Sequence, residues 1–252
     1  MKIYDTLIIG SGYTSVGYAM KNKLTVICEE HQICDTHFYL PLRSFNYKPY
    51  TPKTDEARRL FDIFNSLSLF GEREQNTNGF ECALCRYIEQ NSIDLVLKCR
   101  IVSTVQGADG VYDVTVQTNE GLTHLFAKNI LDTTKSCDKK IFTVLFVSDN
   151  PDEAKRRLFE AFENASIEPA FYKGRYALHI PVGDTDENRI KLEVYNKWRS
   201  LDIDAKILYM APVFYGESGI DRMHDECYGN PIEACDSGYL YAQEKSNDNF
   251  NA

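Results

Sequence analysis

The stretch YDTLIIGSGYTS, residues 4–15, decides how the first part of this chain folds. Its first half is a compact apolar segment ending at Gly10, which is typical of a buried strand followed by a glycine turn. Residues 15–21 can form a helix, and the apolar run LTVIC, residues 24–28, predicts a second buried strand. A strand, a glycine turn, a helix and a strand in this order predict a parallel β-α-β unit.

The turn between the first strand and the helix matches G-x-G-x-x-G with serine in the third place. The motif consists of Gly10, Ser11, Gly12, Tyr13, Thr14 and Ser15. Gly10 permits the tight turn, Gly12 lets the backbone approach a pyrophosphate, and the third residue must be small for close helix–strand packing. The helix N-terminus then offers unpaired N–H groups and a positive dipole end to phosphates. We therefore expect these six residues to bind a dinucleotide.

Two acidic residues, Glu29 and Glu30, follow the second strand, 19 and 20 residues after Gly10. A carboxylate at this spacing accepts the ribose hydroxyls of a dinucleotide and would repel a 2′-phosphate. We prefer Glu29 for this role because it continues the strand. The alternative is a solvated Glu-Glu turn.

Composition and charge exclude several classes of function. The chain of 252 residues has a formal net charge of -9, and its Lys and Arg are scattered, which argues against binding nucleic acid or an anionic membrane surface. We expect no signal peptide, because only a short apolar run precedes the first glycines, and we expect no membrane span, because no apolar run of about 18 residues occurs. Its eight cysteines are expected to be reduced thiols, and the protein is expected to be cytoplasmic.

The middle of the chain predicts two helices and an antiparallel meander. The helices are expected at residues 55–69 and 80–90, and the alternating segments of the meander at 94–105, 111–118 and 122–126. Glycine turns separate these segments, and the meander runs into a short buried strand at residues 129–132.

A change of pattern predicts a smaller inserted α/β domain over residues 138–212. Its expected strands are 140–147, 176–182 and 205–212, and its expected helices are 151–164 and 186–200, with Trp198 in its core. Residues 1–137 and 213–252 would then form the dinucleotide-binding domain, which closes with a helix at residues 231–244.

The order of these parts resembles the FAD-dependent oxidoreductases of the two-dinucleotide-binding-domain type. Residues 93–105, IDLVLKCRIVSTV, resemble the strand whose backbone contacts adenine in that family, which places the contact at Val102. Residues 121–134, GLTHLFAKNILDTT, resemble the stretch leading into the second FAD motif, which places Thr133 at the cofactor. The resemblance implies an α/β fold with a Rossmann-like FAD/NAD(P)-binding parallel sheet and an antiparallel β-meander.

The chain also departs from the family pattern. Thr133 and Thr134 replace the usual small residues of the second motif, and its glycine is absent. The late Gly-Asp motif has no convincing counterpart, because Gly183-Asp184 lies inside the insert. The final helix vaguely resembles the family's closing helix, which approaches the flavin.

The resemblance implies an FAD-dependent oxidoreductase that acts on a small molecule, with the insert as its substrate or partner domain. One alternative is an NAD-binding enzyme or sensor without flavin. Another is a non-catalytic nucleotide-binding scaffold on the same fold, which the altered motifs favour. The sequence indicates neither the catalytic residues nor the substrate, the electron acceptor or the oligomeric state.

Other candidate residues have simpler interpretations. Cys82 and Cys85 form a C-x-x-C, but we expect both thiols on the inner face of a helix, in core packing. Cys34, Asp35 and His37 could do redox or acid–base work near a flavin, or could be chance polar residues of a loop.

Two further positions carry charge in loops. Arg43 could bind an anionic substrate, although a surface arginine packed on aromatic residues is the preferred interpretation. His224 has Asp221, Asp225 and Cys227 close by in sequence. We interpret this stretch as a solvated acidic loop and expect no metal site.

Overall fold

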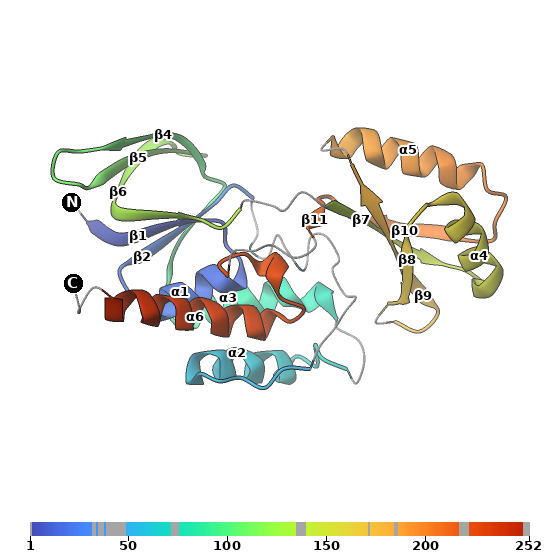
Figure 1. Cartoon of the computed structure of the whole chain (residues 1–252), viewed down its shortest axis with the longest axis horizontal. Helices are drawn as coiled ribbons and strands as arrows, with labels where there is room; N and C mark the ends of the chain where they lie inside the picture. Colours follow the sequence, from blue (N-terminus) through green and yellow to red (C-terminus); the bar gives the residue numbers. More distant parts are fainter. Residues whose placement is uncertain are drawn as a thin grey trace.

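The computed structural model describes two units that lie side by side in Figure 1. The described residues are 2–31, 34, 38, 49–71, 76–134, 140–170, 172–183, 186–216 and 222–248. The first unit contains the first and the last described residues and the predicted β-α-β motif. The second unit is formed by the segment from β7 to β11.

The first unit is built on a six-stranded sheet of order β3-β2-β1-β6-β5-β4. Its strands are β1 (Ile3–Ile9), β2 (Thr25–Glu29), β3 (Asp94–Leu97), β4 (Arg100–Gln106), β5 (Tyr112–Thr118) and β6 (Gly121–Asp132). β1 pairs in parallel with β2 and β6, and β2 with β3, whereas β4, β5 and β6 form an antiparallel meander. The expected Rossmann-like sheet with a meander is therefore confirmed.

Two predictions about strand boundaries are wrong. The segment 94–105 is two strands, because the extended backbone is interrupted at Lys98, which has a positive φ of 51°. β3 then extends the parallel sheet while β4 starts the meander. Conversely, residues 122–126 and 129–132 belong to the single long strand β6, whose early part pairs with β5 and whose later part pairs with β1.

Four helices cover one face of this sheet: α1 (Tyr13–Lys21), α2 (Asp55–Ser66), α3 (Phe80–Gln90) and α6 (Pro231–Asp248). Alternation along β1 and β2 creates two apolar layers. Ile8 and Ile27 pack in the core formed with these helices, whereas Leu7 and Val26 pack with residues of the meander. Short 3-10 turns stand at Thr77–Gly79 (η1) and Asp225–Cys227 (η2).

Helices α1 and α6 cross at two glycines. A Cβ on Gly17 would lie 1.9 Å from the carbonyl oxygen of Cys235, and a Cβ on Gly238 would lie 1.9 Å from that of Thr14. Any side chain at either position would force the two backbones apart. This close crossing fixes the chain before α6 next to the start of α1.

The second unit is an antiparallel sheet of order β10-β7-β9-β8, with β11 paired to β7. Its elements are β7 (Lys140–Val147), α4 (Pro151–Ala161), β8 (Ser166–Pro169), β9 (Arg175–Val182), α5 (Glu187–Arg199), β10 (Lys206–Met210) and β11 (Tyr215–Gly216). Both helices pack on the face that presents Phe142, Val144 and Phe146, and Trp198 is buried there as expected. Strand β8 was not predicted. The domain boundaries at 138 and 212 stay a prediction.

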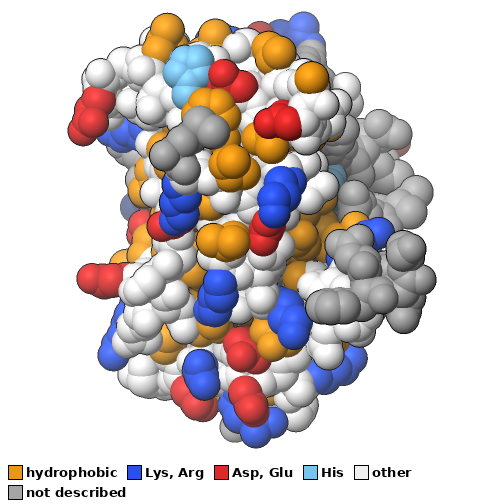
Figure 2. Space-filling view, turned by 90° about the vertical axis from the view of Figure 1, so that its left-hand side faces the viewer, with side chains coloured by type: hydrophobic (Ala, Val, Ile, Leu, Met, Phe, Trp, Pro, Cys, Tyr) orange, Lys and Arg blue, Asp and Glu red, His pale blue; other side chains and the backbone are white. Residues whose placement is uncertain are grey.

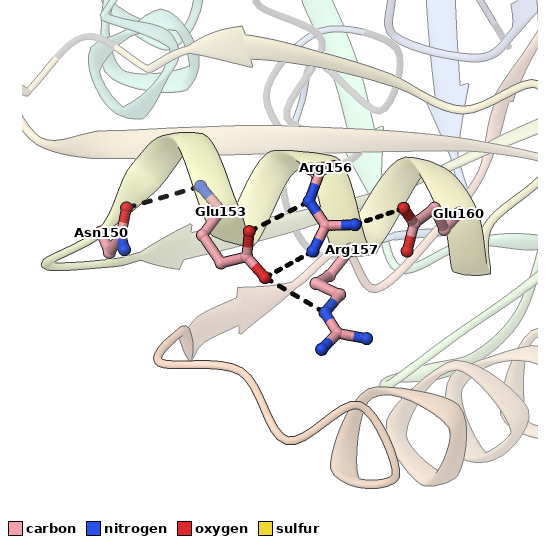
Figure 3. A network of polar contacts seen from close by, with 5 residues as sticks. All are labelled: Asn150, Glu153, Arg156, Arg157 and Glu160. Carbon is pink, nitrogen blue, oxygen red and sulfur yellow. Dashed lines mark hydrogen bonds and ion pairs between the residues drawn. The ribbon is translucent and has the colours of Figure 1, made fainter.

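The exposed surfaces carry charges of both signs. On α4, Asn150 caps the helix, Glu153 pairs with Arg156 and Arg157, and Arg156 also reaches Glu160 (Figure 3). The end of the molecule shown in Figure 2 likewise intersperses Lys and Arg with Asp and Glu around small hydrophobic areas. Exposed ion pairs of this kind add little stability, and neither surface forms a basic stripe.

Candidate nucleotide-binding site

The glycine-rich loop forms the turn that its sequence predicts. Gly10 has a φ of 100°, and its N–H donates to the carbonyl of Cys28 at 2.8 Å, which ties the loop to the end of β2. Helix α1 begins at Tyr13, two residues earlier than expected, with Gly12 as its N-cap. Gly12 has no side chain and so cannot cap the helix, which leaves the first amides of α1 open to an acceptor from elsewhere.

Those amides are taken by a carboxylate from the other end of the chain. Asp225, in η2, accepts a hydrogen bond from the N–H of Tyr13 at 2.7 Å and from that of Thr14 at 2.8 Å. The hydroxyl of Thr14 also donates to it at 2.8 Å. Asp225 is only 1 % exposed. We call this arrangement of the Tyr13 and Thr14 amides and the Thr14 hydroxyl the anion seat.

Gly12 is what lets the carboxylate come so close. A Cβ at this position would lie 2.6 Å from Oδ2 of Asp225 and within 2.9 Å of its other carboxylate atoms. The close approach that the motif predicted for a pyrophosphate is thus used, in this structure, by a protein carboxylate.

Glu29 orders the loop from its other side. Its Oε2 accepts from the amide and the hydroxyl of Ser11 at 2.9 and 2.8 Å, and its Oε1 accepts from the amide and Nδ1 of His31 at 2.9 and 2.8 Å. Burial raises the pKa of Glu29, but the hydrogen bonds from His31 and Ser11 outweigh it and lower that pKa overall. The hydrogen bond to Glu29 raises the pKa of His31. Glu29 therefore stays ionised and fully engaged with its own loop.

The end of β6 closes the base of the loop. Thr133 is buried, donates from its hydroxyl to the carbonyl of Ile9 at 2.8 Å, and lies 3.1 Å from the hydroxyl of Ser15. A Cβ on Gly10 would meet the Thr133 hydroxyl at 2.7 Å. The small-residue rule of the motif is kept at Ser15, while Thr133 fills the space beside Gly10.

A cavity of about 480 Å³ opens at the carboxyl ends of β1 and β2. Its lining residues are Ile9, Gly10, Cys28, Glu29, Glu30, His31, Cys99, Arg100, Ile101, Thr134, Glu187, Val213 and Phe214. This is the edge at which open α/β sheets bind their ligands. Glu187 comes from α5, so the second unit contributes to its wall.

The structure brings some predicted site residues together and separates others. Gly10, Glu29 and Glu30 border the cavity, and Tyr13 and Thr14 form the anion seat beside the loop. Val102 is 54 % exposed and is not among the lining residues, whereas its neighbour Ile101 is. The predicted contact is with the backbone of Val102, which the exposure of its side chain does not test, so this contact stays a prediction.

Two interpretations of loops and thiols are wrong. His224 and Asp225 are buried, not solvated, because η2 packs against the start of α1. Cys82 is exposed and does not lie on the inner face of α3, whereas Cys85 is half-buried and packs against the core as expected. No local pattern could have predicted the Asp225 contact, since its partners lie 211 and 212 residues away.

Other candidates fall partly outside the described residues. The structure describes Cys34, which is buried. The described residues do not include Asp35, His37, Arg43, Lys135, Asp184 and Asp221. Cys28 and Cys99 both line the cavity, and the pKa of Cys28 is raised by its hydrogen bond to Cys99 and by burial. Within the described ranges there is no cluster of three metal-ligating side chains and no helix long and apolar enough to span a membrane.

Comparison with protein-family models and with curated proteins gives no match. Solved structures do match over nearly the whole chain. p-Nitrophenol 4-monooxygenase from Pseudomonas putida aligns with a TM-score of 0.56 at 11 % identity, covering 98 % of this chain and 79 % of that one. A geranylgeranyl bacteriochlorophyll reductase-like protein from Thermoplasma acidophilum aligns with a TM-score of 0.56 at 13 % identity, covering 98 % and 80 %.

A third structure contains FAD. Aklavinone-11 hydroxylase, in a ternary complex with FAD and aklavinone, aligns with a TM-score of 0.53 at 12 % identity, covering 96 % of this chain and 62 % of that one. This chain shares its fold with these three structures. The resemblance inferred from the sequence is therefore confirmed at the level of the fold.

The residues of this chain fit part of an FAD molecule. The cavity, with the acidic residues at the end of β2, has the position and polarity expected for an adenosine moiety. The anion seat has the donors that a pyrophosphate requires, but Asp225 holds them. A pyrophosphate can enter this seat only if the carboxylate leaves.

Proposed function

We propose that this protein is an FAD-binding oxidoreductase that acts on a small molecule. The anion seat carries the proposal: two backbone amides at a helix N-terminus, behind a glycine without a Cβ, already bind an anion tightly. The amides of Tyr13 and Thr14 would hold the pyrophosphate, and the adjoining cavity would hold the adenosine. FAD, when bound, supplies hydride and electron transfer.

The ribose hydroxyls are better assigned to Glu30 than to Glu29. Both border the cavity, but each oxygen of Glu29 already accepts two hydrogen bonds. Glu30 is exposed, so its carboxylate is accessible from the solvent side of the cavity. Glu29 would then shape the loop, while Glu30 would select a ribose with a free 2′-hydroxyl.

The second unit is proposed as the substrate or partner side of the molecule. Glu187 of α5 borders the cavity, as do Val213 and Phe214, which follow β10. A cytoplasmic location stays a prediction.

The proposal is tested by titrating purified protein with excess FAD and following flavin absorbance and fluorescence, beside the Gly12→Glu variant. We expect the wild type to take up FAD and the variant to take up none, because a side chain at position 12 blocks the seat. Far-UV circular dichroism must show that the variant is folded. A folded protein that binds no FAD, even when Asp225 is replaced by Asn, would refute the proposal.

A second candidate is a non-catalytic nucleotide-binding scaffold on the same fold. One observation favours it: Asp225 occupies the seat that a flavin pyrophosphate would need. Under this alternative the cavity would take an adenine nucleotide such as ADP, without any flavin-dependent turnover.

A further inference from the structure

The carboxylate of Asp225 stands where an FAD pyrophosphate would stand. It meets the first two amides of α1 at 2.7 and 2.8 Å and the Thr14 hydroxyl at 2.8 Å. These are the lengths of charge-assisted hydrogen bonds. A helix N-terminus binds carboxylates and phosphates through the same N–H groups and the same dipole, so the two anions compete for one set of donors.

The contact is built by several parts of the structure. The Thr14 hydroxyl also lies 2.7 Å from the carbonyl of Met223, so its one proton is shared between this carbonyl and the Asp225 carboxylate, and the residues just before η2 are held beside α1. The N–H of Tyr228 donates to the Asp225 carbonyl at 3.1 Å, closing the 3-10 turn that aims the side chain at α1. A second anion has no room beside the carboxylate, because even a single Cβ on Gly12 would collide with it.

We propose that Asp225 is an internal competitor for the cofactor, which occupies the pyrophosphate seat and must leave it before FAD binds. This inference rests on the proposed function. It implies that the apparent affinity for FAD equals the intrinsic affinity multiplied by the fraction of molecules in which Asp225 has left the seat. Asp225 would thereby set the occupancy of the cofactor site in this chain.

The loop that carries Asp225 is tied down at its surface by weaker contacts. Arg222 pairs with Glu244 of α6 at 2.8 Å, and both side chains are at least half exposed. Such a pair contributes little, so it does not lock the loop in place. The anion seat supplies three hydrogen bonds to the Asp225 side chain.

The test compares Asp225→Asn with Asp236→Asn. Asp236 is a matched control: it is equally buried and also accepts from backbone amides at a helix start, those of Lys53 and Thr54 before α2. The neutral amide of Asp225→Asn binds the seat less well than a carboxylate. We therefore expect the Asp225→Asn variant to bind FAD at least ten-fold more tightly than the wild type, which is equivalent to about 1.4 kcal/mol. Asp236→Asn should leave FAD affinity within about two-fold.

A second titration, with inorganic pyrophosphate, separates this inference from the proposed function. Amide NMR signals of Tyr13 and Thr14 should shift on adding pyrophosphate to Asp225→Asn, and much less in the wild type. Pyrophosphate binding without FAD binding would uphold the competition and refute the flavin proposal. FAD affinity that is unchanged or weaker in Asp225→Asn would overturn the competition while leaving the flavin proposal standing.

Hydrogen exchange on the wild type keeps the inference testable if Asp225→Asn fails to fold. Adding FAD, or ADP if FAD does not bind, should speed amide exchange at Cys227 and Tyr228, because the turn that holds Asp225 must leave the seat. Protection of this turn by the added nucleotide, with Asp225 still in place, would contradict the inference.

Discussion

Replacing Glu29 with glutamine tests whether one buried carboxylate holds the nucleotide loop together. In the wild type, Glu29 is 3 % exposed and accepts two hydrogen bonds from Ser11 and two from His31. Glutamine keeps one acceptor oxygen, which can serve the two Ser11 donors, and turns its NH2 group toward the two donors of His31. The variant therefore loses the charge, weakens the Ser11 hydrogen bonds and leaves the His31 donors without their acceptor.

The size of the effect follows from these contacts. Hydrogen bonds to a charged group contribute about 1.5–3 kcal/mol each, and the two from Ser11 are buried. The side chain of His31 is 47 % exposed, so its share is discounted to less than about 1 kcal/mol. The two Ser11 hydrogen bonds become neutral ones of about 0.5–1.5 kcal/mol each, so Glu29→Gln should reduce the free energy of unfolding by about 2–3 kcal/mol.

The effect should depend on pH. The pKa of Glu29 is lowered on folding, so its contribution is present above its unfolded pKa of about 4.3 and is lost as pH falls through the folded value. The pKa of His31 is raised, so its contribution is complete below its unfolded pKa of about 6.5 and is lost as pH rises through the folded value. The difference between wild type and variant should therefore be largest between about pH 4.5 and 6.5.

Urea unfolding of both proteins across pH 3.5 to 9, in steps of about half a unit, measures this difference. Asp113→Asn is the control, because Asp113 accepts from His124 at 2.7 Å in the same kind of pair but on the surface. It should cost less than about 1 kcal/mol. A Glu29→Gln cost below about 1 kcal/mol, or one that does not vary with pH, would refute the role given to Glu29.

Three further predictions concern separate parts of the molecule. Gly17→Ala should destabilise the first unit by more than about 3 kcal/mol, because its Cβ would overlap the Cys235 carbonyl. Gly183→Ala is the control and should be nearly neutral, because no atom lies within 4 Å of its Cβ. Thermal melting compares the two variants, and equal melting temperatures would contradict the close crossing of α1 and α6. Burial lowers the pKa of His179 to about 3. The second unit should therefore lose about 2 kcal/mol of stability between pH 7 and pH 5, because the unfolded chain takes up a proton that the folded chain does not. Urea unfolding should show that His179→Gln removes this loss. Glu30→Gln should weaken FAD binding several-fold in a fluorescence titration without lowering the melting temperature; an unchanged affinity would return the ribose role to Glu29.

Local pattern alone predicted the β-α-β unit and its glycine turn. The buried strands and the turn at Gly10 depend on neighbours in sequence, and the structure places β1, α1 and β2 within one or two residues of their expected bounds. Helix α3 and strand β7 were predicted at both ends for the same reason. Where a non-glycine residue with a positive φ interrupts an extended segment, as at Lys98, no such local signal exists, and two strands were taken for one.

The sequence by itself determined the class of the fold and the place of the anion seat, since both follow from residues adjacent along the chain. Only the tertiary structure decided what occupies that seat. The crossing of α1 and α6 at Gly17 and Gly238 brings the segment before α6 against the start of α1, and there Asp225 meets amides more than 200 residues away. A buried N–H must find an acceptor, but which acceptor is nearest depends on packing between distant segments.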